Sequence, residues 1–258
     1  MKENHHEVIR KQFSRQAPRF REEGLTLGDP GHLEWMVSTL PLESHFVVLD
    51  VAAGTGHLGR AIAPHVKRVV ALDATEAMLV EGRREAGRGG VANIIFELGL
   101  AEALPFPDGA FDMVVSRFAM HHFVDPNIPL GEMGRVCRPG GAVAVIDLVS
   151  PEDKALAATY NRFERMRDPS HTQALPASGL KRLMQDAGLD IIHTVSREVD
   201  VTVDRWLELT ATAPEIQRAI IDALTDELRG SQQTGMRPFL RGAELMFRQT
   251  WLMLVGVR

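Results

Sequence analysis

The segment from Val47 to Gly59 constrains the fold of this chain more than any other. It reads Val-Val-Leu-Asp-Val-Ala-Ala-Gly-Thr-Gly-His-Leu-Gly, an apolar run with one carboxylate followed at once by a turn of small residues. Such a run is typical of a buried parallel strand, and the residues from Leu58 to Ala63 after the turn are helix-like. Glycines let a backbone pass close beneath a ligand, because they lack a Cβ and tolerate positive φ. The segment therefore predicts a strand, a tight loop and a helix N-terminus that cradle a nucleotide or cofactor.

Two cofactor classes fit this loop. Gly54-x-Gly56-x-x-Gly59 matches the dinucleotide fingerprint, and Asp73 follows at about the 20-residue distance of a ribose-binding carboxylate. This pattern favours an NAD-dependent oxidoreductase. Asp50 favours a different ligand, because a carboxylate beside a helix N-terminus repels a pyrophosphate. S-adenosylmethionine has no phosphate and carries an ammonium and a sulfonium, so acidic residues near the loop suit it. A third interpretation is a glycine turn that merely joins strand to helix.

The composition narrows the class of protein. The chain has 258 residues, 45% of them apolar, which is enough for one large α/β domain with a cap. Its formal net charge is −5 and it has no long basic run, so we expect no nucleic-acid partner. Its one cysteine, Cys137, cannot form a disulfide framework or a cysteine metal cluster. We see no signal-peptide pattern and no apolar run of the ~20 residues that span a membrane, so we expect a cytoplasmic protein.

Strand-like and helix-like patterns alternate along the chain. The predicted strands are Val47–Val51, Val69–Leu72, Ile94–Leu98, Phe111–Ser116, Ala142–Leu148, Ile191–Val201 and Phe247–Val257. The predicted helices are Leu58–Ala63, Glu76–Glu85, Ile128–Cys137, Glu152–Met166, Ala177–Ala187, Asp204–Leu209 and Glu215–Leu228. This alternation predicts an α/β fold with a doubly wound sheet.

Two segments, residues 1–40 and 202–242, have a less regular, helical pattern. No linker divides the chain, so we expect a single domain over residues 1–258. We expect residues 1–40 to form an N-terminal helical arm and residues 202–242 a helical insert. Together they would form a cap over the carboxyl edge of the sheet.

Four motifs follow one another between residues 46 and 150. They are Leu49-Asp50-Val51-Ala52-Ala53-Gly54-Thr55-Gly56; Val70-Ala71-Leu72-Asp73-Ala74-Thr75; Ala101-Glu102-Ala103-Leu104-Pro105-Phe106-Pro107-Asp108-Gly109-Ala110-Phe111-Asp112; and Arg135-Val136-Cys137-Arg138-Pro139-Gly140-Gly141. Together they resemble the class I S-adenosylmethionine-dependent methyltransferases. The nearest group is type 11, which includes the ubiquinone/menaquinone-biosynthesis methyltransferase family and uncharacterised bacterial relatives. The dinucleotide interpretation accounts for only the first two motifs.

The resemblance implies a fold, a cofactor and an activity. The fold would be a Rossmann-like doubly wound seven-stranded sheet in the order 3-2-1-4-5-7-6, with the last strand antiparallel. The cofactor would be S-adenosylmethionine, and the methyl group would pass to a small-molecule acceptor. A catalytically silent cofactor-binding protein with the same pocket is a further alternative. The sequence indicates no oligomeric state.

The resemblance also assigns residues to the cofactor. Asp50 would lie near the methionine ammonium in a charge-assisted contact. Asp73 would accept from both ribose hydroxyls, since a carboxylate has two acceptor oxygens. Ala52 stands in place of the first glycine of the family loop, and Leu100 where many relatives have an aspartate for the adenine amino group. The implied cofactor-binding residues are Asp50, Ala52, Gly54, Gly56, Asp73, Ala74, Met78, Leu100, Ala101, Glu102, Arg117 and Phe118.

Histidines dominate the candidate residues on the acceptor side. His121 and His122 follow the fourth strand, but consecutive helical positions point about 100° apart, so we do not expect them to share one role. Further along, Asp168 would orient His171, and His171 would take a proton from the substrate at neutral pH. The alternative for this segment is an Asp-Pro turn with a capping serine. The candidate catalytic residues are His171, Asp168 and His122, and no spacing of His, Asp and Glu predicts a metal site.

Overall fold

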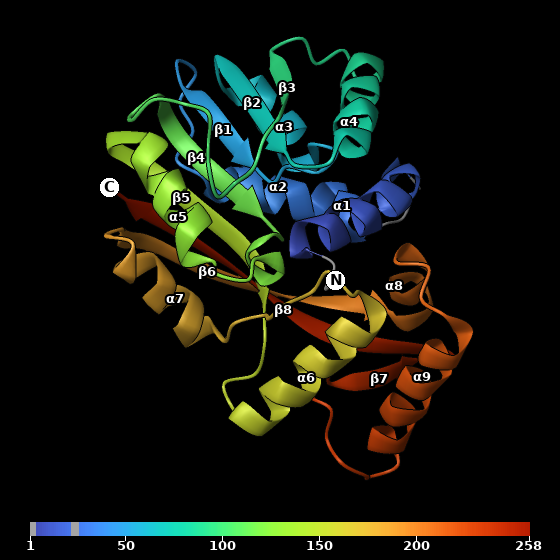
Figure 1. Cartoon of the computed structure of the whole chain (residues 1–258). Helices are drawn as coiled ribbons and strands as arrows, with labels where there is room; N and C mark the ends of the chain where they lie inside the picture. The colour runs from blue at the N-terminus through green and yellow to red at the C-terminus, as the bar shows by residue number, and fades with distance from the viewer. Residues whose placement is uncertain (1–3, 22–25) are drawn as a thin grey trace.

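The computed structural model describes residues 4–21 and 26–258. Residues 1–3 and 22–25 of the predicted arm lie outside the described residues. One β-sheet runs through the described part of the chain (Figure 1). Its strands are β1 Val47–Val51, β2 Arg68–Asp73, β3 Ile94–Leu98, β4 Phe111–Arg117, β5 Cys137–Val149, β6 Asp190–Thr202, β7 Pro238–Arg241 and β8 Glu244–Val257.

The strand order is β3-β2-β1-β4-β5-β8-β6, and β7 pairs with β8 outside this path. Neighbouring strands from β3 to β5 are parallel, whereas β8 is antiparallel to both β5 and β6. The predicted seven-stranded order is therefore confirmed, with one extra strand. β7 was not predicted, because it is short. It pairs with β8 across the hairpin at Gly242, whose positive φ of 63° suits a tight turn.

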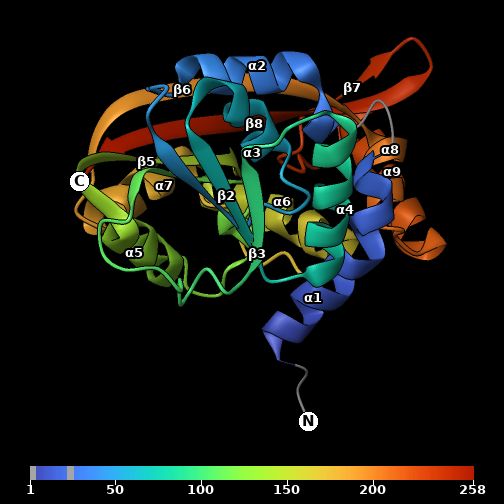
Figure 2. The same cartoon turned by 90° about the horizontal axis from the view of Figure 1, so that it is seen from above.

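Helices cover both faces of the sheet (Figure 2). The α-helices are α1 His5–Gln16, α2 Pro30–Thr39, α3 His57–Ile62, α4 Glu76–Arg88, α5 Asn127–Val136, α6 Lys154–Arg167, α7 Ala177–Asp186, α8 Val203–Leu209 and α9 Pro214–Leu228. Short 3₁₀ turns are η1 Ala17–Arg21, η2 Thr26–Gly28, η3 Ala63–His65 and η4 Met120–His122. No described helix is long and apolar enough to cross a membrane.

Alternate residues of each central strand pack into two different cores. In β1, Val48 packs with α2 and α3, whereas Leu49 and Val51 face α5 and α7. Burial on both faces explains why the strands read as continuous apolar runs. The predicted helix that reached Cys137 ends one residue earlier, at Val136, because the chain turns there into β5.

The two flanking segments meet beside the carboxyl ends of the strands (Figure 1). α1 is tied to the segment around α8, since Arg15 Nη2 donates to the carbonyl of Ala211 at 2.7 Å and Arg19 donates to the carbonyl of Glu208. Other helices of the two flanks pack elsewhere: α2 buries Met36 in the core, and α9 packs against β7 and α6. Only part of each flank thus lies over the sheet edge.

Candidate active site

A cavity of about 190 Å³ lies at the carboxyl ends of β1, β2, β4 and β5. This is the edge at which parallel α/β sheets place their ligands. The wall includes residues of the glycine loop, the ends of β2 and β4, and parts of α1, α6, α8 and β8. Every residue predicted to bind the cofactor lines this cavity except Gly56.

The glycine loop is held in an unusual backbone conformation. Ala52, Gly54 and Gly56 have positive φ values of 53°, 58° and 74°. A Cβ on Gly54 would meet no atom within 4 Å, so the loop leaves open space at this point of the wall. Gly56 serves a different purpose, because it begins α3 and its Cβ would come within 2.8 Å of the Phe96 ring. Its smallness permits helix packing, away from the cavity.

Asp50 is buried beneath the loop. Its Oδ2 accepts a hydrogen bond from the amide of Gly59 at 2.9 Å, while Oδ1 is enclosed without a partner. Burial raises the pKa of Asp50 to about 7, although Arg117 opposes this by stabilising the charged form. An enclosed carboxylate oxygen with no donor fits a cationic ligand nearby.

Asp73 stands at the end of β2 and holds the loop in place. Its Oδ2 accepts from the amide of Gly54 and its Oδ1 from the amide of Thr75, each at 2.8 Å. Burial raises the pKa of this carboxyl group, and these amide hydrogen bonds oppose the rise. Each carboxylate oxygen can accept more than one hydrogen bond, so both retain capacity for a diol.

Arg117 and Phe118 end β4 inside the cavity. Phe118 has a φ of 53°, which is strained for a residue with a Cβ. Its amide donates to Ile146 at 2.7 Å, and its ring lies 4.6 Å from that of Trp251. Arg117 donates through Nη1 to the carbonyl of Leu27 at 2.7 Å. Both side chains therefore form part of the cavity wall where β4 ends.

The remaining predicted cofactor residues line the cavity on α4 and on the segments that follow β2 and β3. Met78 and Ala101 are buried, whereas Leu100 is 40% exposed. Glu102 lies with its carboxylate 3.9 Å from Nε2 of His6 on α1. Ala74 lines the wall between Asp73 and Met78.

His121 and His122 both line the cavity, but they have different hydrogen-bond partners. Their ring centroids are 4.2 Å apart, because a 3₁₀ turn at the end of β4 presents both. His121 donates through Nδ1 to Asp147 at 2.6 Å, whereas His122 donates through Nδ1 to the carbonyl of Ser170 at 3.0 Å. Burial and the adjacent His121 lower the pKa of His122 to about 4.

The structure does not form the predicted pair of Asp168 and His171. Asp168 lines the cavity, but its carboxylate accepts from Ser170 and from Nε2 of Gln16. His171 is buried outside the cavity wall and donates through Nε2 to Asn161 at 2.8 Å. Burial and the neighbouring histidines lower its pKa, so the ring stays neutral. The Asp-Pro segment turns the His171 side chain back into the protein, which corrects its assignment as the group that faces the acceptor.

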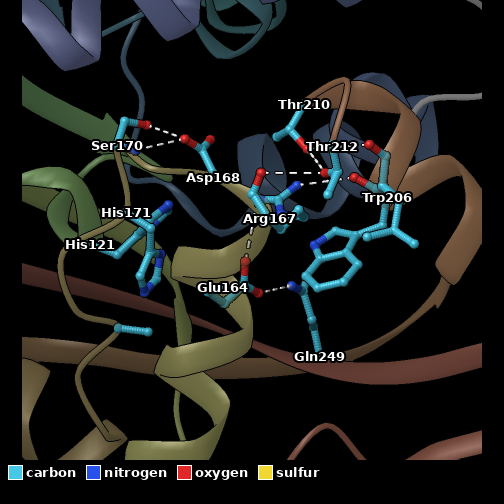
Figure 3. Close-up of polar contacts among 12 residues, drawn as sticks. His121, Glu164, Arg167, Asp168, Ser170, His171, Trp206, Thr210, Thr212 and Gln249 are labelled. Atoms are coloured by element: carbon cyan, nitrogen blue, oxygen red, sulfur yellow. Dashed lines mark hydrogen bonds and ion pairs between the residues drawn. The ribbon is translucent and has the colours of Figure 1, made fainter. Parts of the chain in front are cut away.

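A buried polar network forms the far end of the cavity (Figure 3). Glu164 is fully buried; its Oε2 lies 3.3 Å from Arg167 Nη2, and its Oε1 accepts from Gln249 at 3.3 Å. The Arg167 guanidinium lies 4.7 Å over the Trp206 ring, and Trp251 donates to Gln249 at 3.1 Å. Arg167, Trp206, Gln249 and Trp251 all line the cavity.

The residues of this polar network, and Asp147 beside His121, were not predicted from the sequence. Asp147 carried a usable signal, because it is a carboxylate at the end of the apolar run of β5, as Asp50 is in β1. Arg167, Trp206 and Gln249 lie on three separate elements and carried no such signal. In the described residues, no group of three or more His, Cys, Asp or Glu side chains is arranged to hold a metal ion.

Known proteins are similar to this chain in sequence and in fold. A model of the methyltransferase domain matches residues 48–141. The uncharacterized methyltransferase YcgJ of Bacillus subtilis is 32% identical over 220 residues, covering 84% of this chain and 87% of YcgJ. The chain belongs to the class I S-adenosylmethionine-dependent methyltransferases. Membership of this family favours S-adenosylmethionine, the second of the two ligands that the glycine loop left open.

Two further comparisons place this methyltransferase among its relatives. The demethylmenaquinone methyltransferase of Thermus thermophilus is 32% identical over 203 residues, which are 69% of this chain and 91% of that protein. The crystal structure of YcgJ superposes with a TM-score of 0.79 at 29% identity and covers 89% of this chain and 99% of YcgJ. The predicted resemblance to the quinone-biosynthesis methyltransferases is thus confirmed.

Proposed function

We propose that this methyltransferase acts on a small, uncharged, aromatic acceptor. The acceptor carries an ionisable hydroxyl group or a C–H bond of similar acidity. One observation carries the proposal: the cavity that contains the glycine loop is also lined by Phe118, Trp206 and Trp251 and by two histidines. Flat aromatic walls favour stacking of an aromatic ring. Relatives named demethylmenaquinone methyltransferase support a quinol-like ring.

The residues at the loop end fit the cofactor. The enclosed oxygen of Asp50 suits its ammonium, and the free acceptor capacity of Asp73 suits its ribose diol. Ala74, Met78, Leu100, Ala101 and Glu102 would surround the adenine. Arg117 and Phe118 would lie near the methionyl chain. When bound, the cofactor supplies an electrophilic methyl group, and the protein contributes position and exclusion of water.

His122 and Asp168 belong to this proposal as groups that contact or position the acceptor. His122 stays neutral near pH 7 and offers Nε2 to the cavity, because Nδ1 is bonded to Ser170. The Asp168 carboxylate accepts a hydrogen bond from Gln16 at the end of α1 and so links α1 to the cavity wall. We place the activity in the cytoplasm, where the lone buried thiol of Cys137 stays reduced.

Transfer of a labelled methyl group tests the proposed function. We expect label to move from S-adenosylmethionine to 1,4-dihydroxynaphthalene or to simple naphthols. An amine, a carboxylic acid and a thiol of similar size serve as control acceptors. Transfer only to a control acceptor would reject the aromatic class. Tight cofactor binding without transfer to any acceptor would favour a catalytically silent protein.

Cofactor affinity should depend on pH through Asp50. With a pKa of about 7, Asp50 is largely protonated below that pH, and it must lose its proton to attract the ammonium. Linkage then predicts binding about eightfold weaker at pH 6 than at pH 7.5, and a plateau above pH 8. The same shift means that ionising Asp50 opposes folding, so its contribution to stability falls as the pH rises from about 4 to 7.

Calorimetric titration of wild type and Asp50→Asn from pH 6 to 8 measures this effect. Asparagine keeps an oxygen for the amide of Gly59 but has no proton to lose. The variant should bind more weakly and with little pH dependence. An identical pH profile in both proteins would assign the titration to another group.

We propose that α1 and α8 form the movable part of the cap. Both line the cavity, and the only buried residue of α1 is Gln16. Hydrogen exchange should show less protection in α1 and α8 than in β1 and β4, and a gain of protection when demethylated cofactor binds. α2 is an internal control because Met36 anchors it in the core. Equal protection of α1 and β1 in the free protein would show that the cap is rigid.

A further inference from the structure

A buried imidazole and carboxylate couple the end of β4 to the end of β5. Nδ1 of His121 donates to Oδ1 of Asp147 at 2.6 Å. Asp147 also accepts from the amide of Leu148 at 2.8 Å and from the amide of His121 at 3.2 Å. Three donors converge on one carboxylate and fix its orientation. The His121 tautomer is set by this arrangement, with hydrogen on Nδ1 and a lone pair on Nε2.

Nε2 of His121 is available to a molecule in the cavity. Within the described residues it makes no hydrogen bond, and it is not among the enclosed polar atoms that lack a partner. His121 lines the cavity wall, so an acceptor bound in the cavity would lie beside this imidazole.

The other two histidines of the cluster are poorer proton acceptors. Nδ1 of His122 is bonded to a neutral carbonyl, and the ring has a pKa of about 4. His171 lies outside the cavity wall. Burial disfavours a charged His121 as well, but the Asp147 carboxylate outweighs burial and raises the pKa of His121. The charged or titratable groups that face His121 are Asp147 on β5, His122 on η4, Glu164 and Arg167 on α6, and His171 after α6.

We propose that His121 is the general base of this methyltransferase and that Asp147 is its positioning residue. This proposal rests on the proposed function, because it requires an acceptor that loses a proton. The O–H or C–H bond of the acceptor breaks as its proton passes to Nε2 of His121. The released electron pair forms the new bond to the methyl carbon, and the pair of the broken sulfur–carbon bond stays on sulfur. The imidazolium is stabilised by Asp147 until it returns the proton to solvent.

His121 also lines a second, small pocket. It has a volume of about 10 Å³ and is lined by His121, Asp147 and Gln173 among others. That volume is about the size needed for one water molecule, and the carboxylate and amide supply polar partners. His121 lines both pockets, so it stands between the acceptor and this water-sized space.

The variant His121→Asn separates a base from a structural residue. The asparagine amide can still donate to Asp147, but it has no atom in place of Nε2. We expect turnover of 1,4-dihydroxynaphthalene to fall by roughly 100-fold or more, with cofactor affinity within about twofold of wild type. His193→Gln, on the exposed edge of β6, is the matched control and should retain full turnover. Turnover by His121→Asn within about threefold of wild type overturns the proposal.

Asp147→Asn tests the positioning role through the pH profile. Turnover by wild type should rise with pH through a midpoint above 6.5, because the base must be unprotonated. The midpoint should move to lower pH in Asp147→Asn, since the charge that raises it is gone. A reduced rate with an unmoved midpoint would overturn the positioning role.

Histidine NMR of the full-length protein with demethylated cofactor bound decides the matter without an acceptor. We expect His121 to carry hydrogen on Nδ1, to titrate above pH 6.5 in wild type, and to titrate lower in Asp147→Asn. A His121 that does not titrate, or that carries hydrogen only on Nε2, overturns the proposal. If wild type methylates no aromatic probe while His121 behaves as expected, the acceptor class is wrong and the base assignment stands.

Discussion

Replacing Asp73 with alanine should weaken binding of S-adenosylmethionine by about 30-fold. Each hydrogen bond from a ribose hydroxyl to the carboxylate contributes roughly 1.5–3 kcal/mol, and water entering the gap reduces the combined loss to about 2 kcal/mol. That free energy corresponds to about 30-fold in Kd. Calorimetric titration of the purified variant measures it directly.

Asp73→Ala should also lower the free energy of unfolding, because the Asp73 carboxylate also holds the glycine loop in place. Its oxygens accept from the amides of Gly54 and Thr75, and alanine leaves both without a partner. Asp73→Asn keeps one acceptor oxygen and should lose less stability while losing most of the affinity. Asp186→Ala, at the exposed end of α7, is the control acid. Wild-type affinity in Asp73→Ala would show that this carboxylate only holds the loop.

Arg167→Ala should cost roughly 3–5 kcal/mol of the free energy of unfolding, because it leaves a buried carboxylate uncompensated. Glu164 has no solvent exposure, and Arg167 is its ion-pair partner at 3.3 Å. Gln249 would still donate to the carboxylate, but no positive charge would remain as its ion-pair partner. Urea unfolding of wild type and variant measures the loss.

Two further variants separate the buried charge from simple loss of packing. Arg165→Ala, on the exposed side of the same helix, should cost less than about 1 kcal/mol. The double variant Glu164→Gln with Arg167→Met removes both charges and should recover much of the loss, since a buried pair can be replaced by neutral groups at little cost. If Arg167→Ala and Arg165→Ala are equally stable, the ion pair contributes nothing in solution.

The cofactor half of the site was predictable because its signals are local. The site begins with three contiguous segments: the apolar run of β1, the loop from Ala52 to Gly56 and the start of α3. The apolar run indicates a strand, and the glycines that follow indicate a tight loop before a helix. Asp50 and Asp73 each follow from their place on a recognisable strand. The sheet order came from the four-motif resemblance, and only the short hairpin strand β7 was added by the structure.

The acceptor half was decided by tertiary structure, because its contacts join residues far apart in the chain. Asp147 reaches His121 across 26 positions, and Gln249 reaches Glu164 across 85. His171 was predicted to be a base from its sequence context, but the structure does not place it at the acceptor. The turn after α6 directs its side chain to Asn161. Periodicity shows that a residue lies on an element, whereas the neighbour that its side chain meets depends on how distant elements pack. The sequence by itself therefore determined the fold and the cofactor, and packing between β4, β5, α6 and β8 decided which side chains surround the acceptor.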